Sequence, residues 1–305
     1  MIAGMFLRHK PRGETSFSLV RALKAELAQR GESGPIVHGG ALDPFAEGLL
    51  PLLTGPATRL FELLHALPKT YRATVEWGRE TDTGDHLGSV IAEGAPETLS
   101  AEALTPARID AGLAALLGSS MQEPPAFSNK RVDGERAHVR ARRGEEVSLT
   151  PQRIFVLSAV ALTHDLPRRS VVDFVCRGGT YVRTLARDVG RALGCRAHLS
   201  TLSRSAVGPF ADPGPAGSLF VRGPDLLPWA RTRVLTDDEA RRVELSRLIP
   251  LGDMRPPSWV VPEGFPDPQA PIAALHAGAL VALLSIRGHE LKPVTDLRDG
   301  AGRGL

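Results

Sequence analysis

The sequence of 305 residues predicts an α+β fold with a mixed sheet, because of the order of its helical and strand-like stretches. Stretches with helical and with strand periodicity are intermixed, without the regular alternation of a doubly wound parallel sheet. Hydrophobic residues make up 42% and charged residues 23% of the chain, which are ordinary values for a globular protein. Because the length exceeds the usual range of a single core, we expect one large domain and a smaller one.

Apolar residues at helical spacing, ended by a glycine or proline in most cases, predict helices at residues 16–30, 57–67, 109–117 and 181–193. Alternating or continuous apolar residues predict strands at residues 71–77, 154–162 and 171–176. Residues 1–11 are expected to form a short strand followed by a turn.

The pattern changes around residues 224–233, where a polar helix at 237–245 follows and an apolar stretch at 272–286 can supply two buried strands. We therefore expect a main domain of residues 1–230 and a small C-terminal domain of residues 231–305. Such a tail is short for independent stability, so it is expected to pack against the main domain.

The run HGGALDPFAEG at residues 38–48 places one carboxylate, Asp43, in a glycine-flanked turn before an apolar stretch. Glycine permits φ > 0 or a close backbone approach, and Pro44 holds Asp43 extended, so the side chain should project from a stiff loop. By itself, an Asp-Pro pair in such a turn is more often structural. The whole run, however, resembles the G-H-x-G-x-L-D-P-x-A-x-G-x-L signature of the TruB-type tRNA pseudouridine synthases, in which the aspartate is essential.

This resemblance implies a mainly antiparallel sheet of the pseudouridine synthase type flanked by helices, and isomerisation of uridine 55 in the tRNA T loop. The reaction breaks an N-glycosidic bond, turns the freed uracil and joins its C5 to the sugar, so no cofactor is required. Asp43 would act as nucleophile at C1′ or at C6, or assist elimination at C2′, and these routes remain open.

Two further runs resemble family motifs that position the aspartate. Arg183 lies in GGTYVRTL at residues 178–185, where the family arginine pairs with the catalytic aspartate. Asp85 lies in TDTGDHLG at residues 81–88 and would hold the other side of the guanidinium. The alternatives are an exposed helical arginine and, for Asp82 in the same run, a loop cap.

The chain has two tyrosines, Tyr71 and Tyr181, and both fall inside matched runs. Tyr71, in KTYR, resembles the family tyrosine that stacks on the target uracil and has a part in removing the C5 proton. His38 resembles a side chain that fills the gap left when the base leaves its stack, a step that costs a few kcal/mol. A lone histidine is otherwise more often a hydrogen-bonding loop residue.

Residues 130–143 hold six Lys or Arg against two acids, an excess that suits a phosphate backbone. The predicted RNA-binding residues are Lys130, Arg131, Arg140, Arg142 and Arg143 of this run, together with His38 and Tyr181 of the runs that resemble the family motifs. A solvated helix face is the alternative for the basic run. Aromatic residues, at 5%, are too few for a stacking platform of the RRM kind.

Two more runs widen the resemblance, QEPPAFSNK at residues 122–130 and LSRSAVGPF at residues 202–210, so that matched runs span residues 4–210. The sequence departs from the usual family residues at four positions, His9, Val37, Asn129 and His138. A degenerate PUA-like RNA-binding domain is one interpretation of the tail.

Other functional classes are disfavoured. The two cysteines, Cys176 and Cys195, have neither CxxC spacing nor a nearby histidine cluster, so we expect packing residues and neither a disulfide nor a metal site. No apolar run is long enough to span a membrane, and the N-terminus lacks a secretion signal, so a cytoplasmic protein is expected.

The sequence thus predicts a monomeric enzyme whose partner is the tRNA T-stem loop and which needs no protein partner. One rival is the related catalytic subunit that requires a guide RNA and protein partners, which normally carries a clear PUA domain. A second rival is a tRNA-folding chaperone that binds the substrate without chemistry.

Overall fold

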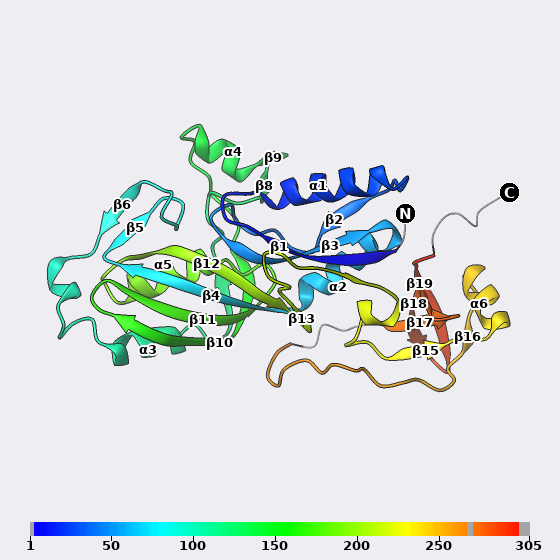
Figure 1. Ribbon diagram of the computed structural model, residues 1–305. Helices are drawn as coiled ribbons and strands as arrows, with labels where there is room; N and C mark the ends of the chain where they lie inside the picture. The colour runs from blue at the N-terminus through cyan, green and yellow to red at the C-terminus, as the bar shows by residue number, and fades with distance from the viewer. Residues whose placement is uncertain (1–2, 267–270, 299–305) are drawn as a thin grey trace. The chain divides into compact units, whose positions relative to one another are not determined.

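The computed structural model describes residues 3–266 and 271–298, which form two compact units (Figure 1). The first unit comprises Met1–Pro44, Gly48–Leu67 and Ala206–Leu305, and the second comprises Phe45–Glu47 and Pro68–Ser205. The predicted boundary between residues 230 and 231 falls inside the first unit, and it stays a prediction. Parts of the expected N-terminal strand (residues 1–2) and of the tail (267–270 and 299–305) lie outside the described residues.

The helices and strands of the first unit are β1 (Gly4–Lys10), α1 (Ser16–Gln29), β2 (Ile36–His38), β3 (Glu47–Thr54), η1 (Gly55–Leu60), α2 (Phe61–Ala66), β13 (Phe210–Ala211), β14 (Ser218–Val221), η3 (Gly223–Leu226), β15 (Thr232–Val234), α6 (Asp237–Glu244), β16 (Ile249–Pro250), β17 (Ile272–His276), β18 (Ala279–Arg287) and β19 (Glu290–Asp296). Strand β1 pairs with both β14 and β3, and β2 pairs with β3, in each case antiparallel.

Strand β3 is buried on both faces because its successive side chains enter different hydrophobic clusters. Leu50 and Leu52 pack with Leu23 of α1. Leu49 and Leu53 belong instead to the cluster that contains the α2 leucines. Since neighbouring strand residues point to opposite faces, one strand supports a helical layer on each side.

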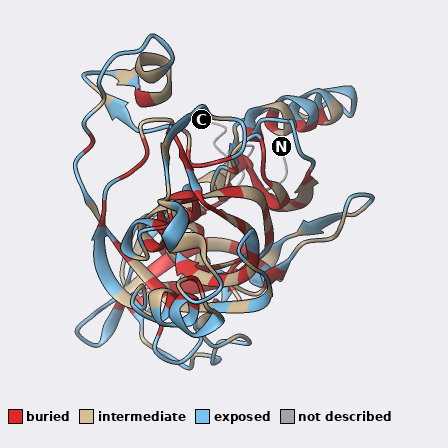
Figure 2. Ribbon diagram, turned by 90° about the vertical axis from the view of Figure 1, so that its left-hand side faces the viewer, coloured by how far each residue is buried: buried red, intermediate tan, exposed pale blue. Residues whose placement is uncertain are grey.

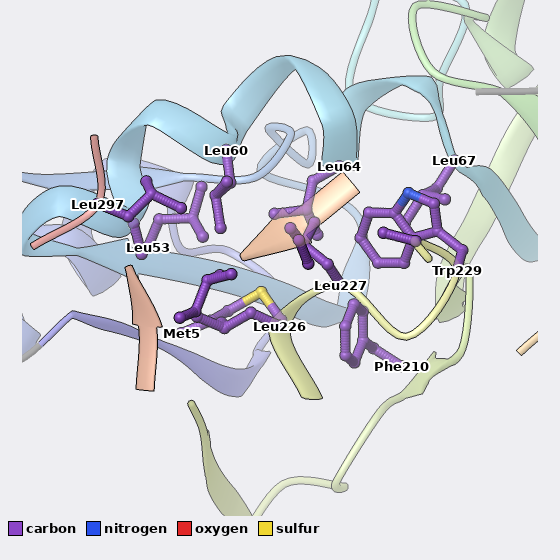
Figure 3. Close-up of a cluster of buried hydrophobic side chains, with 14 of the residues drawn as sticks. Met5, Leu53, Leu60, Leu64, Leu67, Phe210, Leu226, Leu227, Trp229 and Leu297 are labelled. Atoms are coloured by element: carbon purple, nitrogen blue, oxygen red, sulfur yellow. The ribbon is translucent and has the colours of Figure 1, made fainter. Parts of the chain in front are cut away.

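The C-terminal strands form a separate sheet in the order β15-β17-β18-β19-β16, in which β15 runs parallel to β17. One face of this sheet packs with Val243 of α6. The other face supplies Leu275, Leu280 and Leu283 to the same cluster as Met5 of β1. Figure 3 shows this cluster, which joins the tail to the N-terminal strands.

The second unit contains β4 (Pro68–Trp77), β5 (Arg79–Thr81), β6 (Val90–Glu93), η2 (Pro96–Leu99), α3 (Pro106–Ala114), β7 (Gly118–Gln122), β8 (Arg131–Val132), β9 (Glu135–Arg136), α4 (Ala137–Arg142), β10 (Gln152–Asp165), β11 (Arg169–Arg177), α5 (Val182–Ala192) and β12 (Ala197–Val207). Its main strands follow the order β12-β4-β11-β10-β7, with β4–β11, β11–β10 and β10–β7 antiparallel. Buried residues gather on the strands, whereas loops and outer helix faces are exposed (Figure 2).

Helix α5 approaches the start of β12 so closely that only glycine fits at one position. A Cβ atom at Gly190 would lie 2.5 Å from the backbone nitrogen of Ala197. The helix then ends near Gly194, whose φ of 76° suits the left-handed turn after a helix. The glycine that was expected to end this helix therefore does so.

The predicted helices and strands are confirmed, although residues 57–67 begin as the 3-10 helix η1 before α2 and the predicted strand at 154–162 is the longer β10. The apolar stretch at 272–286 forms two strands, β17 and β18, as expected. Several strands, among them the long β3 and β12, lie where the sequence predicted no element. In β3 the apolar residues from Leu49 to Leu53 are continuous because both faces are buried, so the alternation that marks a half-buried strand is missing.

The substitution Leu64→Ala should lower the free energy of unfolding by roughly 2–5 kcal/mol, because it leaves a cavity in the cluster of the first unit. Leu64 is 0% exposed. Chemical denaturation measures the change. Leu245→Ala, at a side chain that is 62% exposed, is the control and should alter the value by less than about 0.5 kcal/mol. Equal losses for both variants would contradict the placement of Leu64 in the core.

Candidate active site

Asp43 is half-buried in the loop between β2 and β3, in the first unit. The residue before it, Leu42, is held by Ser16 at the start of α1. The Leu42 N–H donates to Ser16 Oγ at 2.8 Å, and Ser16 Oγ donates to the Leu42 carbonyl oxygen at 3.1 Å. A hydroxyl can both donate and accept, so one side chain satisfies both backbone groups of Leu42.

The residue after Asp43 is held as well. The Pro44 carbonyl oxygen accepts from the Gly13 N–H at 2.8 Å and from Lys10 Nζ at 3.4 Å. Lys10 is 0% exposed, and its ammonium also donates to the carbonyls of Pro11 and Glu14 at 2.8 Å each. Both neighbours of Asp43 are thus attached to the segment from Lys10 to Ser16.

The glycines before Asp43 are required by backbone geometry. Gly39 N–H donates to the Pro51 carbonyl at 2.7 Å, and a Cβ atom at Gly39 would lie 3.2 Å from that of Pro51. Gly40 has a φ of 126°, a conformation that side chains disfavour. His38, half-buried, ends β2 immediately before these glycines. Its predicted role beside a displaced base stays a prediction.

Arg183 lies in the first turn of α5, in the second unit, and is 3% exposed. The alternative of an exposed helical arginine is therefore wrong. Its guanidinium donates to the carbonyl oxygens of Thr83 and, at 3.0 Å, Phe127. Gly84 makes room for it, since a Cβ atom there would lie 3.2 Å from the Cβ of Arg183.

Asp85 is buried in the turn after β5, and its carboxylate serves the turn itself. Asp85 Oδ1 accepts from Thr83 Oγ1 at 2.9 Å and from the Leu87 N–H at 3.0 Å. Arg183 is thus linked to this turn through the Thr83 backbone, while Asp85 shapes the turn from within. Asp82 accepts from the Ser89 N–H at 2.9 Å, as expected of a loop cap.

Tyr71 is buried in β4, opposite Phe174 of β11. Lys69, two residues earlier and therefore on the same face, is opposite Cys176 and is 3% exposed. Burial and the charge of Arg204 lower the pKa of Lys69 to about 7, and burial raises the pKa of Cys176 to about 12. Tyr71 therefore shares its sheet face with a buried amine that titrates near neutral pH.

Tyr181, just before α5, is positioned by a residue that was not selected from the sequence. The Tyr181 N–H donates to Gln122 Oε1 at 2.9 Å, and Gln122 Nε2 donates to the Tyr181 carbonyl at 3.2 Å. Gln122 is 2% exposed. The signal was present, because Gln122 opens the matched run QEPPAFSNK, but nothing local indicates a partner 59 residues away.

The basic run at residues 130–143 forms the small hairpin β8–β9 and helix α4. Arg140 contacts Asp133 at 3.1 Å and Glu145 at 2.8 Å. Arg143 contacts Glu135 and Glu145, each at 2.6 Å. These two arginines are therefore partly neutralised, and the local excess of positive charge is smaller than predicted because Glu145 follows the run.

Lys130, Arg131 and Arg142 are exposed, and no carboxylate of the described residues lies within ion-pair distance of them.

Elsewhere, both cysteines are buried and free, as expected of packing residues. Within residues 3–266 and 271–298, no three His, Cys, Asp or Glu side chains gather to hold a metal ion. In the same ranges no helix is long and apolar enough to cross a membrane.

Residues 32–182 match the family model described as TruB family pseudouridylate synthase (N terminal domain), and residues 183–221 match tRNA pseudouridylate synthase B C-terminal domain. A relative from Nocardia farcinica called tRNA pseudouridine synthase B is 36% identical, over 100% of this chain and 95% of its own. The relative of the same name from Arthrobacter sp. is 34% identical, over 96% of each chain. This chain belongs to the TruB family of pseudouridylate synthases. The resemblance of its motifs is thereby confirmed, and so is the expectation of an enzyme of the isomerase class.

Two solved structures resemble this TruB family member in fold. The H/ACA RNP bound to a substrate RNA containing 2′-deoxyuridine has a TM-score of 0.65 at 18% identity, covering 97% of this chain and 85% of the other. The Cbf5-Nop10-Gar1 complex has a TM-score of 0.65 at 19% identity with the same coverage. The predicted α+β fold of the pseudouridine synthase type is confirmed.

The lowered pKa of Lys69 predicts a pH dependence of stability in this TruB family member. The group is charged in the unfolded chain up to about pH 10.5 but loses its proton near pH 7 when folded, so stability should rise between these values. Lys69→Met removes this titration. Relative to wild type, the variant should be most stable below pH 7 and should lose that advantage as pH rises towards 10.

Urea denaturation between pH 6 and pH 10 measures this difference. Lys130→Met, at an exposed lysine, is the matched control and should leave the pH dependence as in wild type. A difference between wild type and Lys69→Met that is constant over the range would show that Lys69 does not titrate there.

Proposed function

We propose that this TruB family member is a tRNA pseudouridine synthase that isomerises uridine 55 of the T loop, with Asp43 as the nucleophile. The observation that carries the proposal is the double attachment of the Asp43 loop, through Leu42 to Ser16 and through Pro44 to Gly13 and Lys10. A nucleophile must be held in a reactive orientation, and a loop fixed on both sides meets that need. Support for the substrate comes from relatives called tRNA pseudouridine synthase B.

The chemistry is an isomerisation that needs only side chains of the protein. The bond from N1 of uracil to C1′ breaks, the base turns, and C5 bonds to C1′ while the C5 proton is lost and N1 gains one. Neither a redox change nor an external group is involved, so no cofactor is proposed. Attack at C1′, attack at C6 and assisted elimination at C2′ all remain compatible with one carboxylate.

Arg183 is proposed to orient the Asp43 carboxylate. The guanidinium is removed from solvent, and carbonyl oxygens of Thr83 and Phe127 fix its plane. A planar guanidinium can bind a carboxylate through two parallel hydrogen bonds. Asp85 is proposed to act by shaping the turn that carries Thr83. Its hydrogen bonds to Thr83 and Leu87 within that turn support this role.

Tyr71 and His38 are proposed to handle the base. Tyr71 would stack on the target uracil and take part in removing the C5 proton, which its buried position on β4 supports. His38 would occupy the gap left by the flipped base, whose extrusion costs a few kcal/mol. Its place at the end of β2, ahead of the rigid glycine turn, supports this role.

The proposed RNA path follows Tyr181, Lys130, Arg131, Arg140, Arg142 and Arg143. Exposed cations displace counterions from phosphates most effectively when no carboxylate already neutralises them. We therefore assign the larger share of the phosphate binding to Lys130, Arg131 and Arg142. The smaller share is assigned to Arg140 and Arg143. The solvated face remains the alternative.

We also propose that the enzyme acts in the cytoplasm as a monomer without a protein partner. The rival is a guide-dependent catalytic subunit, because the two solved structures are ribonucleoprotein or multiprotein complexes. A tRNA chaperone without chemistry is the second rival. The tail of residues 231–305 is proposed as a small C-terminal domain, with the PUA-like interpretation kept open.

Incubating the purified protein with an unmodified tRNA transcript should convert uridine 55 to pseudouridine without guide RNA. Asp43→Asn keeps the shape but lacks a nucleophilic carboxylate, so turnover should disappear while tRNA binding persists. Pseudouridine mapping and filter binding measure the two properties. A yield for Asp43→Asn within tenfold of wild type, about 1.4 kcal/mol in barrier, would exclude Asp43 as the nucleophile. Product only with added guide RNA would favour the first rival.

Replacing Lys130, Arg131 and Arg142 together by Gln should flatten the dependence of log affinity on log salt by up to about three units, at roughly 0.9 per phosphate contact in a duplex. The matched control replaces Arg140 and Arg143, which should change the slope less because carboxylates already neutralise them. Titrating tRNA affinity against salt measures both slopes. An unchanged slope for the triple variant would mean that the basic run faces solvent and the RNA path lies elsewhere.

A further inference from the structure

The hydroxyl of Ser16 makes a closed pair of hydrogen bonds with a single residue of the Asp43 loop. Ser16 is 6% exposed, and its Oγ accepts from Leu42 N–H and donates to Leu42 C=O, 26 residues along the chain. One hydroxyl therefore satisfies the two backbone groups of Leu42 that a neighbouring strand would bind in a sheet. Both bonds are buried, so their loss would leave polar backbone groups without solvent to satisfy them.

Ser16 is itself attached to a rigid element. It is the first residue of α1, whose N-cap Thr15 accepts from the Ser18 N–H. The helix is fixed by Leu23, which packs against Leu50 and Leu52 of β3. Side chains that are locked on helices or strands position a site more accurately than loops do, so the Ser16 hydroxyl is a stable reference point.

The position of Leu42 controls the direction of the next side chain. The Leu42 carbonyl belongs to the peptide that leads directly into Asp43, so a rotation of that peptide moves the carboxylate. On the other side, Pro44 is held by the Gly13 N–H and by Lys10, and this attachment does not involve Ser16. Loss of the Ser16 hydroxyl would therefore remove the attachment at Leu42 and leave the attachment at Pro44 in place.

We propose that Ser16 is a positioning residue for Asp43, acting through the paired hydrogen bonds to Leu42. The proposal rests on the proposed function, since it requires Asp43 to be the nucleophile. Ser16 touches neither substrate nor reacting atoms in this role. Its effect is to hold the carboxylate in an attack geometry, and misplacement by about 1 Å can cost roughly a hundredfold in rate.

The test compares Ser16→Ala with Ser18→Ala. Ser18 lies on the same helix, and its hydroxyl bonds to Glu14 and to the Thr15 carbonyl without reaching the loop. Single-turnover conversion of a tRNA transcript should slow roughly ten- to a hundredfold for Ser16→Ala and less than twofold for Ser18→Ala. Affinity for tRNA, measured with each substitution placed in the Asp43→Asn protein so that no product forms, should stay within twofold of Asp43→Asn alone.

Hydrogen exchange provides a readout that a general loss of stability would not reproduce. Peptides that contain the Leu42 amide should exchange faster in Ser16→Ala than in wild type, whereas peptides from the core of α1 around Leu23 should be unchanged. Rapid exchange of the Leu42 amide in wild type would overturn the proposal directly. If Ser16→Ala does not fold, Ser16→Cys, in which a somewhat larger thiol is a weaker donor and acceptor, replaces it.

A wild-type rate in Ser16→Ala would overturn the proposal even if exchange at Leu42 rises. Equal losses of rate and affinity would also overturn it, because they indicate a structural role. Failure of the proposed function would give a different result. In that case Asp43→Asn would still convert the tRNA transcript, whatever the rate of Ser16→Ala. A slow rate with unchanged affinity and local exchange at Leu42 supports the positioning role.

Discussion

The burial of β3 on both faces is the constraint on which the first unit depends. Leu50 and Leu52 anchor helix α1, while Leu49 and Leu53 enter the cluster shared with α2 and the C-terminal sheet. A shift of one residue would exchange the two sets of side chains, so the register is strongly determined. The Asp43 loop leads into this strand, and α1 carries the residue that holds the loop. The packing of one strand therefore positions both the loop of the proposed nucleophile and the helix whose Ser16 holds that loop.

In each of the two units, buried polar side chains bind backbone atoms of loops. Lys10 and Arg183 donate to carbonyl oxygens, and Ser16 and Gln122 each bind both backbone groups of one residue. A desolvated polar group is costly unless it is hydrogen-bonded, so these side chains hold the loops in one conformation. Lys69 differs, because burial beside Arg204 disfavours its charge. Burial thus has two effects here. It makes the hydrogen bonds of these side chains to loop backbones costly to break, and it lowers the pKa of Lys69 in β4.

Much of the fold could be predicted because its signals are local. The helix that begins at Ser16 and the one that ends before Gly194 follow from apolar spacing and from the positive φ that glycine permits. Strands β3 and β12 could not be predicted in this way. The leucines of β3 lack alternation because two layers cover it, and the existence of the second layer is a property of the folded chain.

The sequence by itself determined the family and selected Asp43 and Arg183, because long motifs preserve residue types at fixed local spacing. Only the tertiary structure decided that Arg183 is buried, that Ser16 holds the residue before Asp43, and that Glu145 neutralises part of the basic run. Each of these depends on which groups meet in space and on how much water is excluded there. Residues 26 positions apart, such as Ser16 and Leu42, become neighbours only after the helix and the sheet have packed together.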